Sequence, residues 1–339
     1  EPGYTFAGWS PERTDTVTDN VTYTAQWTAN SDTKYMVEYY YQQMNGSYSK
    51  AGEDEREGTT GDTAKLTSED QKPGEGLGVT GKTYALASTE DGKVIAGDGS
   101  TVLKVYFKLQ FTVKYEPGDH GTFPVDTHGG LDLDDTTPDF AGSTNQHNPG
   151  YTFNGWKPVV AETVTDDATY VAQWTPNENT KYTVEYYYQQ LEDGSYSMVD
   201  TADRTGTTDE RATLTEEDKT PGSGGVSGKT YALAEDRVVD NQNIEGDGST
   251  VLKVYFKLQF TVKYQPGTKG TFAEQSTGSL DYGVATPAAP DAAKNHAPGY
   301  TFAGWNPVWA DTVTDDVTYV AQWTPNSDTG YTVRHFLQN

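Results

Sequence analysis

The 339-residue chain contains no cysteine, only two isoleucines, and 24 basic residues against 50 acidic ones. The absence of cysteine excludes a disulfide framework and a zinc site built on thiolates. Leu, Ile, Val and Phe together provide 54 of the 339 residues, about 16%. A share below roughly 20%, combined with a high net charge, usually indicates disorder. No run of about 18 apolar residues exists, so the sequence predicts no membrane-spanning helix.

The shortage of basic residues also limits the partners that the chain can have. Its formal net charge is −26. A chain this acidic is repelled by the phosphates of nucleic acids and by anionic lipid surfaces. We therefore expect no nucleic-acid partner and no insertion into a membrane.

Internal repeats are the strongest feature that the sequence does contain. The string Gly-Tyr-Thr-Phe-x-Gly-Trp begins at Gly3, Gly150 and Gly299, with spacings of 147 and 149 residues. A second string, Val-Glu-Tyr-Tyr-Tyr-Gln-Gln, begins at Val37 and Val184. Repetition at a fixed period is the signature of an array of similar units. The sequence therefore predicts a tandem array in which two module types alternate.

We name these two types module A and module B. The complete copies of module A span residues 110–177 and 259–326, those of module B span 34–109 and 181–258, and partial copies occupy 1–28 (the C-terminal half of a module A) and 331–339 (the start of a module B). A complete copy is close to the lower size at which a domain can fold alone. Because both ends cut through a module, we expect the chain to be an excerpt of a longer array.

Alternating patterns predict strands in both module types. In module A, Phe111, Val113 and Tyr115 alternate with Thr112 and Lys114, which is the period of a half-buried strand. The 24 Tyr, 7 Trp and 50 Thr provide the side chains for sheets and cores that the few Leu and Ile residues do not provide. We therefore predict a mainly β fold rather than disorder.

Two local elements are predicted in module B. Asp193-Gly194 is a favoured two-residue hairpin turn. Thr215 is suited to cap a short helix over 215–219 that Pro221 stops, and residues 67–70 are its twin in the other copy.

The two kinds of joint between modules differ in pattern. From module B to module A, residues 103–115 and 252–264 alternate without interruption, which predicts a single strand of about 14 residues, roughly 45 Å long, through both modules. From module A to module B, residues 175–181 form a short polar stretch rich in turn formers. We expect the first joint to be stiff and bending to concentrate at the second.

Both modules are recognisable from these residues. Module A, with Phe-Thr-Val-Lys-Tyr from Phe111, the Gly150 string and Ala-Gln-Trp from Ala172, closely resembles the internalin B-type (Listeria-Bacteroides) repeat. Module B, with Gly-Lys-Thr-Tyr from Gly228 and Gly-Asp-Gly-Ser-Thr from Gly246, looks like the MucBP (mucin-binding protein) repeat. The resemblances imply compact β-grasp-like modules strung along a bacterial surface protein, and neither family is enzymatic.

Histidine clusters are the first candidates for a metal site. His120, His128 and His147 lie in one module A, but only one of the three persists in the other copy, as His296. A zinc site needs three or four converging ligands. We therefore predict no zinc site.

Acidic clusters offer the hard oxygen ligands that calcium needs. The candidates are Asp132, Asp134, Asp135 and the pairs Asp166-Asp167 and Asp315-Asp316. The other copy replaces Asp134 and Asp135 by Gly283 and Val284, and no calcium-loop spacing occurs. We favour solvated, turn-forming carboxylates over a metal site, and predict no metal and no cofactor.

No group of residues predicts catalysis. Glu162 and Asp166 are paired carboxylates, but no apolar run predicts a pocket that would shift their pKa values. Ser195 has no histidine near it in its module. We therefore predict that the chain is not an enzyme and has no catalytic residue.

Outward-facing tyrosines are the candidate ligand contacts. If Tyr186 and Tyr188 face the core, Tyr187 points outward, as does Tyr40 in the other copy. An outward tyrosine can stack on a sugar ring or on a side chain of a partner. The alternative is a packing contact at a strand edge or between modules.

We therefore expect an elongated, monomeric rod that forms the stalk of an extracellular bacterial adhesin and projects a distal binding domain. The alternative is that the MucBP-like modules bind mucin-type glycans or a host surface protein, with weak sites summed along the array. A repeated, contiguous aromatic or polar patch on module B would favour the alternative.

Overall fold

The computed structural model describes residues 1–338, and their fold is mainly β, as predicted. The chain divides into two compact units, the first made of residues 1–147 and 153–175 and the second of 148–152 and 176 onward. Each unit contains one seven-stranded sheet. No helix of the described residues is long and apolar enough to cross a membrane.

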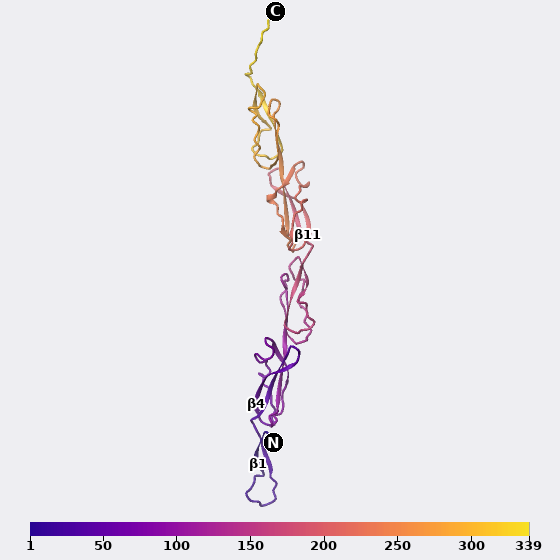
Figure 1. Ribbon diagram of the computed structural model, residues 1–339, viewed down its shortest axis with the longest axis vertical. Coiled ribbons are helices and arrows are strands. Elements are labelled where there is room, and N and C mark those ends of the chain that lie inside the picture. Colours follow the sequence, from indigo (N-terminus) through magenta and orange to yellow (C-terminus); the bar gives the residue numbers. More distant parts are fainter. Residues whose placement is uncertain (339) are drawn as a thin grey trace. The chain divides into compact units, whose positions relative to one another are not determined.

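The first nine strands lie in the first unit, apart from residues 151–152 and 176, which fall in the second. They are β1 (Tyr4–Ser10), β2 (Thr24–Ala29), β3 (Thr33–Gln42), β4 (Tyr48–Gly58), β5 (Thr83–Glu90), β6 (Val102–Glu116), β7 (Asp126–Leu131), β8 (Tyr151–Lys157) and β9 (Ala168–Pro176). Strands β1 and β2 form a separate two-stranded ribbon (Figure 1).

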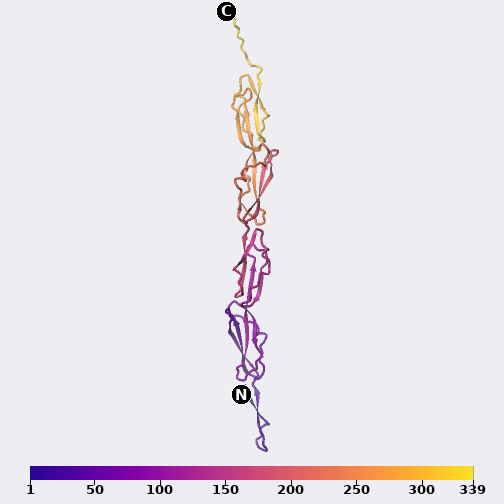
Figure 2. The ribbon, with the colours of Figure 1, turned by 90° about the vertical axis from the view of Figure 1, so that its right-hand side faces the viewer.

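The second unit repeats the order of β3 to β9 with three small added elements, β12, η1 and β14. Its elements are β10 (Thr180–Gln189), β11 (Tyr196–Gly206), β12 (Arg211–Ala212), β13 (Thr230–Leu233), the 3₁₀ helix η1 (Glu235–Arg237), β14 (Gln242–Asn243), β15 (Val251–Gln265), β16 (Gln275–Asp281), β17 (Tyr300–Asn306) and β18 (Val317–Pro325). Residues 331–338, where the sequence predicts the start of a further module, form no strand (Figure 2), and Asn339 lies outside the described residues.

Strand β6 is shared between module B and module A. Its first half pairs in parallel with β3 and antiparallel with β5, while β4 continues the sheet beyond β3. Its second half pairs in parallel with β9 and antiparallel with β7, while β8 continues the sheet beyond β9. In the second unit, β15 takes the same place between β10 and β18. In every complete module, the first and last strands are therefore the central parallel pair.

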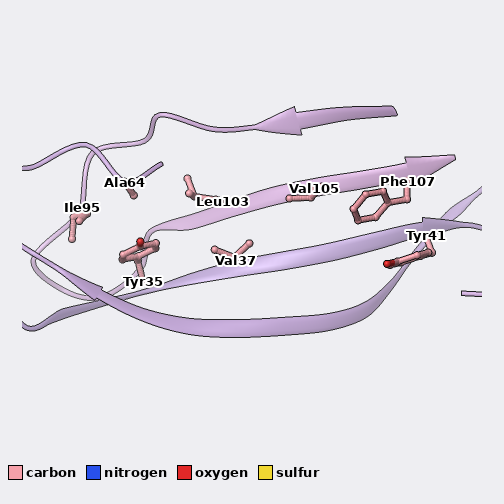
Figure 3. Close-up of a cluster of buried hydrophobic side chains, with 8 residues drawn as sticks. All are labelled: Tyr35, Val37, Tyr41, Ala64, Ile95, Leu103, Val105 and Phe107. Atoms are coloured by element: carbon pink, nitrogen blue, oxygen red, sulfur yellow. The ribbon is translucent and has the colours of Figure 1, made fainter. Parts of the chain in front are cut away.

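The uninterrupted strand from module B to module A is confirmed in both units. Strand β6 and strand β15 each have 15 residues. On β6, Leu103, Val105 and Phe107 enter the core of module B (Figure 3). The next residues of the same alternation, Leu109, Phe111 and Val113, enter the core of module A. One strand thus contributes to two neighbouring cores.

A polar contact reinforces each of these joints. Lys82, from the loop before β5, places its ammonium 3.0 Å from Asp167 and also contacts Asp166. Asp167 in turn accepts a hydrogen bond of 2.9 Å from the backbone N–H of Thr112. The second unit repeats the arrangement with Lys229, Asp315 and Asp316. The acidic pairs that are candidates for calcium therefore hold a lysine of the neighbouring module.

The segment between module A and module B is short and hydrogen-bonded. In the second unit, Asn177 donates its backbone N–H to the carbonyl of Gly150 at 2.8 Å and accepts from the N–H of Thr208 at 3.0 Å. A Cβ on Gly246 would lie 1.9 Å from the carbonyl oxygen of Pro149, so only glycine fits there. The two units divide at Thr175 and Pro176, within this segment. That bending concentrates here stays a prediction.

Two local predictions in module B are wrong. Gln190 donates its N–H to the carbonyl of Ser195 at 2.7 Å, so the hairpin closes on a longer loop in which Gly194 has a φ of +72°. Residues 215–219 form hydrogen-bonded turns rather than a helix. Thr215 caps the turn as predicted, but Pro221, which has no N–H to donate, follows before a second turn is completed.

Candidate functional site

Tyr40 and Tyr187 lie on the sheet face opposite the core, and each stacks on a second tyrosine. The parallel register sets Tyr40 beside Tyr106 and Tyr187 beside Tyr255. The ring centroids are 5.1 Å apart at 24° in the first pair and 4.6 Å apart at 15° in the second. All four rings are half-buried. The two predicted contact residues are therefore members of stacked pairs rather than isolated outward side chains.

A third tyrosine completes a patch in each copy. Tyr48 meets the edge of Tyr106 with centroids 5.4 Å apart, and Tyr196 meets Tyr255 at the same distance. We call the sets Tyr40, Tyr48, Tyr106 and Tyr187, Tyr196, Tyr255 the outer-face tyrosine triads. Tyrosine offers a large apolar surface with a polar end, which suits a contact surface.

A lysine and a carboxylate border each triad. The ammonium of Lys104 lies 5.7 Å from the ring centre of Tyr40, and that of Lys253 lies 5.6 Å from Tyr187, within the range of a cation–π contact. The hydroxyl of Tyr40 donates to Glu38 at 2.7 Å. The hydrogen bond from Lys50, followed by that from Tyr40, lowers the pKa of Glu38. This carboxylate is therefore charged at neutral pH.

The corresponding carboxylate of the second copy is Glu185. It accepts a hydrogen bond of 2.7 Å from Tyr187 and lies 3.3 Å from the ammonium of Lys253. Its hydrogen bond raises the pKa of the Tyr187 hydroxyl, with a smaller contribution from burial. The hydroxyl therefore stays protonated and keeps its hydrogen bond to Glu185.

Each module B also has a cleft on the core side of its sheet. We call it the loop cleft, because one wall is the glycine-rich loop that starts at Pro73 or Pro221. Its volume is 620 Å³ in the first copy and 530 Å³ in the second, within the usual range for small-ligand sites. Tyr41 and Tyr188 lie at the base of the two clefts and accept hydrogen bonds of 2.7 Å from the loop amides of Gly74 and Gly222.

A buried ion pair lies beside each cleft, and sequence patterns did not find it. Asp70 is 5% exposed and is bound by Arg56, while Asp218 is 3% exposed and is bound by Arg204. Burial alone would raise the pKa of Asp70, but hydrogen bonds from Arg56, Thr67 and Tyr39 hold it well below its usual range. The only sequence signal was the Thr-x-x-Asp string, which predicts a helix cap rather than an ion pair.

The candidate metal ligands have other partners. His128 lies 3.0 Å from Asp126, and His147 packs against Trp174 with ring centroids 5.1 Å apart. Asp132 contacts Lys108 and accepts a hydrogen bond from Gln110. Among the described residues, no three acidic, histidine or cysteine side chains come together as a metal site.

Two of the candidate catalytic residues have other partners. Asp166 is bound to Lys82 of the neighbouring module. The backbone N–H of Ser195 donates to the side chain of Asp193 at 2.9 Å. Module B thus has an aromatic surface on one face of its sheet and a cleft with a tyrosine at its base on the other face.

Comparison with known proteins assigns no family to the chain. Models of known protein families give no match to the chain, and curated protein sequences give none either.

Proposed function

We propose that this chain is a non-enzymatic stalk region of a bacterial cell-surface adhesin, an elongated rod that projects a distal binding domain. Its place is extracellular, attached to the cell wall through regions outside this segment. The sequence resemblance to internalin B-type and MucBP repeats motivates the proposal. The strand order supports the β-grasp-like part of it, because first and last strands form the central parallel pair of each module.

The observation that carries the proposal is the strand shared by each module B and the module A that follows it. Because β6 belongs to two cores and Lys82 bridges the same joint, the two modules resist bending against each other. A stiff joint is what a stalk requires. The net charge of −26 supports a monomeric rod, because neighbouring copies repel each other.

Small-angle scattering of the whole chain tests this proposal. We expect an extended distance distribution and a monomeric mass. A flexible Gly-Ser insertion between Leu109 and Gln110 cuts the shared strand and shortens the mean dimension, whereas the same insertion after Asn177 has a smaller effect. A compact profile for the unaltered chain would contradict the proposal.

A second candidate function is binding of mucin-type glycans or a host surface protein through module B. The observation that favours it is that both copies carry an outer-face tyrosine triad with a bordering lysine and carboxylate. A stalk without a ligand requires only polar outward positions. Weak binding at each copy would be strengthened by repetition along the chain.

Binding of the whole chain to a glycan array and to immobilised mucin tests this second function. We expect saturable binding that is lost in the double variant Tyr40→Ala, Tyr187→Ala. The matched control is Tyr331→Ala, which removes an exposed tyrosine outside the triads. Absence of binding, or equal loss in the control, would leave the stalk as the only supported function.

A further inference from the structure

The first and last strands of every complete module lie side by side and run in the same direction. In module B, the register joins residues 36–41 of β3 to residues 102–107 of β6. In module A, it joins residues 113–116 of β6 to residues 168–171 of β9. The second unit has the same six and four pairs, between β10 and β15 and between β15 and β18.

This arrangement decides how a pull on the two ends of the chain loads each module. The chain enters module B at the start of β3 and leaves it through β6, at the opposite end of the same parallel pair. The pull slides the two strands past each other, so all the hydrogen bonds between them carry the load at once. In the antiparallel β1–β2 ribbon, in contrast, both chain ends lie at one end of the pair, and the bonds can open one after another.

The shared strand passes the load from one module to the next. Strand β6 receives it from β3 and transfers it to β9, and two side chains extend the pairing where the partner changes. Gln42, the last residue of β3, accepts a hydrogen bond of 3.1 Å from the N–H of Leu109. Asp167, directly before β9, accepts one of 2.9 Å from the N–H of Thr112. The change of partner on β6 is therefore completed between Leu109 and Thr112.

Both side-chain contacts recur at the second shared strand. Gln189 accepts a hydrogen bond of 3.0 Å from the N–H of Leu258. Asp316 accepts one of 2.8 Å from the N–H of Thr261. The same two contacts at both joints indicate that they belong to the pair of modules rather than to one copy.

We propose that the chain is a tension-bearing element, in which sheared parallel strands resist a pull on the two ends and module B resists it more than module A. Forced unfolding is governed by the barrier to unfolding, and this barrier rises with the number of bonds that must break together. Module B has six lateral pairs and module A has four. The inference deepens the proposed stalk function and rests on it for the source of the pull, because a stalk is pulled when its distal domain holds a ligand.

Single-molecule force spectroscopy tests the proposal, and the absence of cysteine lets two introduced thiols define where the pull acts. In the variant Lys34→Cys, Lys114→Cys, the pull slides β3 along β6. In Lys34→Cys, Glu57→Cys, it opens the antiparallel β3–β4 pair from its end, where these two residues face each other. All three positions are exposed. We expect the sliding geometry to need about threefold more force, because six pairs rather than one or two share the load.

Two neighbouring glutamines provide a matched pair of variants for the sliding geometry. Gln42→Ala removes the acceptor for Leu109 and should lower the rupture force by roughly one seventh, because one of about seven lateral links is lost. Gln43→Ala should leave the force unchanged, because the amide of Gln43 contacts only Tyr41 and Ser49. Circular dichroism checks that both variants keep the fold.

A pull on the two ends of the whole chain tests the order of unfolding. Both complete copies of module A should open before either copy of module B, and the gain in length identifies them, at most roughly 240 Å for residues 110–177 and 270 Å for residues 34–109. Equal forces in the two pulling geometries, module B opening first, or equal forces in the two glutamine variants would each overturn the proposal. Such a result together with an extended scattering profile would leave the stalk function standing.

Discussion

The two copies of module B share their strands but use one carboxylate differently. In the first copy, Asp54 faces Val37 across the β3–β4 pair and accepts a hydrogen bond of 2.9 Å from Tyr39. In the second copy, Ala202 stands at that place, facing Val184. The carboxylate occurs two residues earlier, as Asp200, where the first copy has Gly52.

This two-residue displacement moves a negative charge along one face of the strand. In the first copy the charge lies beside the buried ion pair, and Arg56 binds Asp70 through both of its terminal nitrogens. In the second copy the charge lies at the cleft, Arg204 binds Asp218 through one nitrogen at 2.6 Å, and its Nε has no partner among the described residues. The arginine therefore has this second carboxylate as a neighbour in the first copy only.

The largest expected effect comes from removing the two arginines. We expect Arg56→Met to destabilise its module by about 3 kcal/mol, because a buried carboxylate loses its counterion and two hydrogen bonds. Arg204→Met should cost about 2 kcal/mol, because only one hydrogen bond is lost. The remaining partners match, since Thr67 and Tyr39 correspond to Thr215 and Tyr186.

Hydrogen exchange measured by mass spectrometry can assign each loss to its module through peptides from residues 34–58 and 181–206. Each variant serves as the control for the other, because the unaltered copy should keep its protection. Equal costs in the two modules would show that the second nitrogen contact in the first copy contributes nothing.

Acid should weaken both modules through the same buried carboxylates. The folded-state pKa of Asp70 is lowered, so its contribution is complete above the unfolded pKa of about 3.9 and is lost as the pH falls below it toward the folded value. The slope is about 1.4 kcal/mol per pH unit for each such group. The pKa of Asp218 is lowered as well, by its hydrogen bonds from Tyr186 and Thr215 against the opposing effect of burial.

Denaturant unfolding between about pH 5 and pH 2 measures this effect. Asp70→Asn and Asp218→Asn should each flatten the acid dependence, and the first should flatten it more, because Asp70 has the additional arginine contact. A wild-type stability that does not change over this interval would show that neither carboxylate is coupled to folding.

The alternation of apolar residues predicts much of this architecture because it depends on neighbours in sequence. Residues 103–115 keep one period, so the shared strand was predictable, and the outward direction of Tyr40 followed from the same rule. The stacking partner Tyr106 was not predictable, because the parallel register of β3 and β6 brings it from a distant part of the chain.

The loop cleft and its ion pair depend on contacts between distant residues in the same way. The Thr-x-x-Asp string at Thr67 indicates local capping, which does occur. That the same Asp70 also binds an arginine on β4 follows only from how the loop folds back onto the sheet. The repeated strings align Gly52 with Asp200 in sequence, but only the fold shows that Asp200 lines a cleft.

The smallest effect should come from exchanging the displaced carboxylate itself. Asp54→Ala removes an acceptor from Tyr39 and a partially exposed contact with Arg56, at a cost of about 0.5 kcal/mol. Ala202→Asp places a carboxylate beside Arg204 and Tyr186 and should stabilise its module by a similar amount. Thermal unfolding of the two variants, with hydrogen exchange to assign the module, measures both. The two changes in stability must have opposite signs, because each variant gives its copy the residue type that the other copy has at this position. If both variants were destabilising, the second copy would be adapted to the absence of this charge.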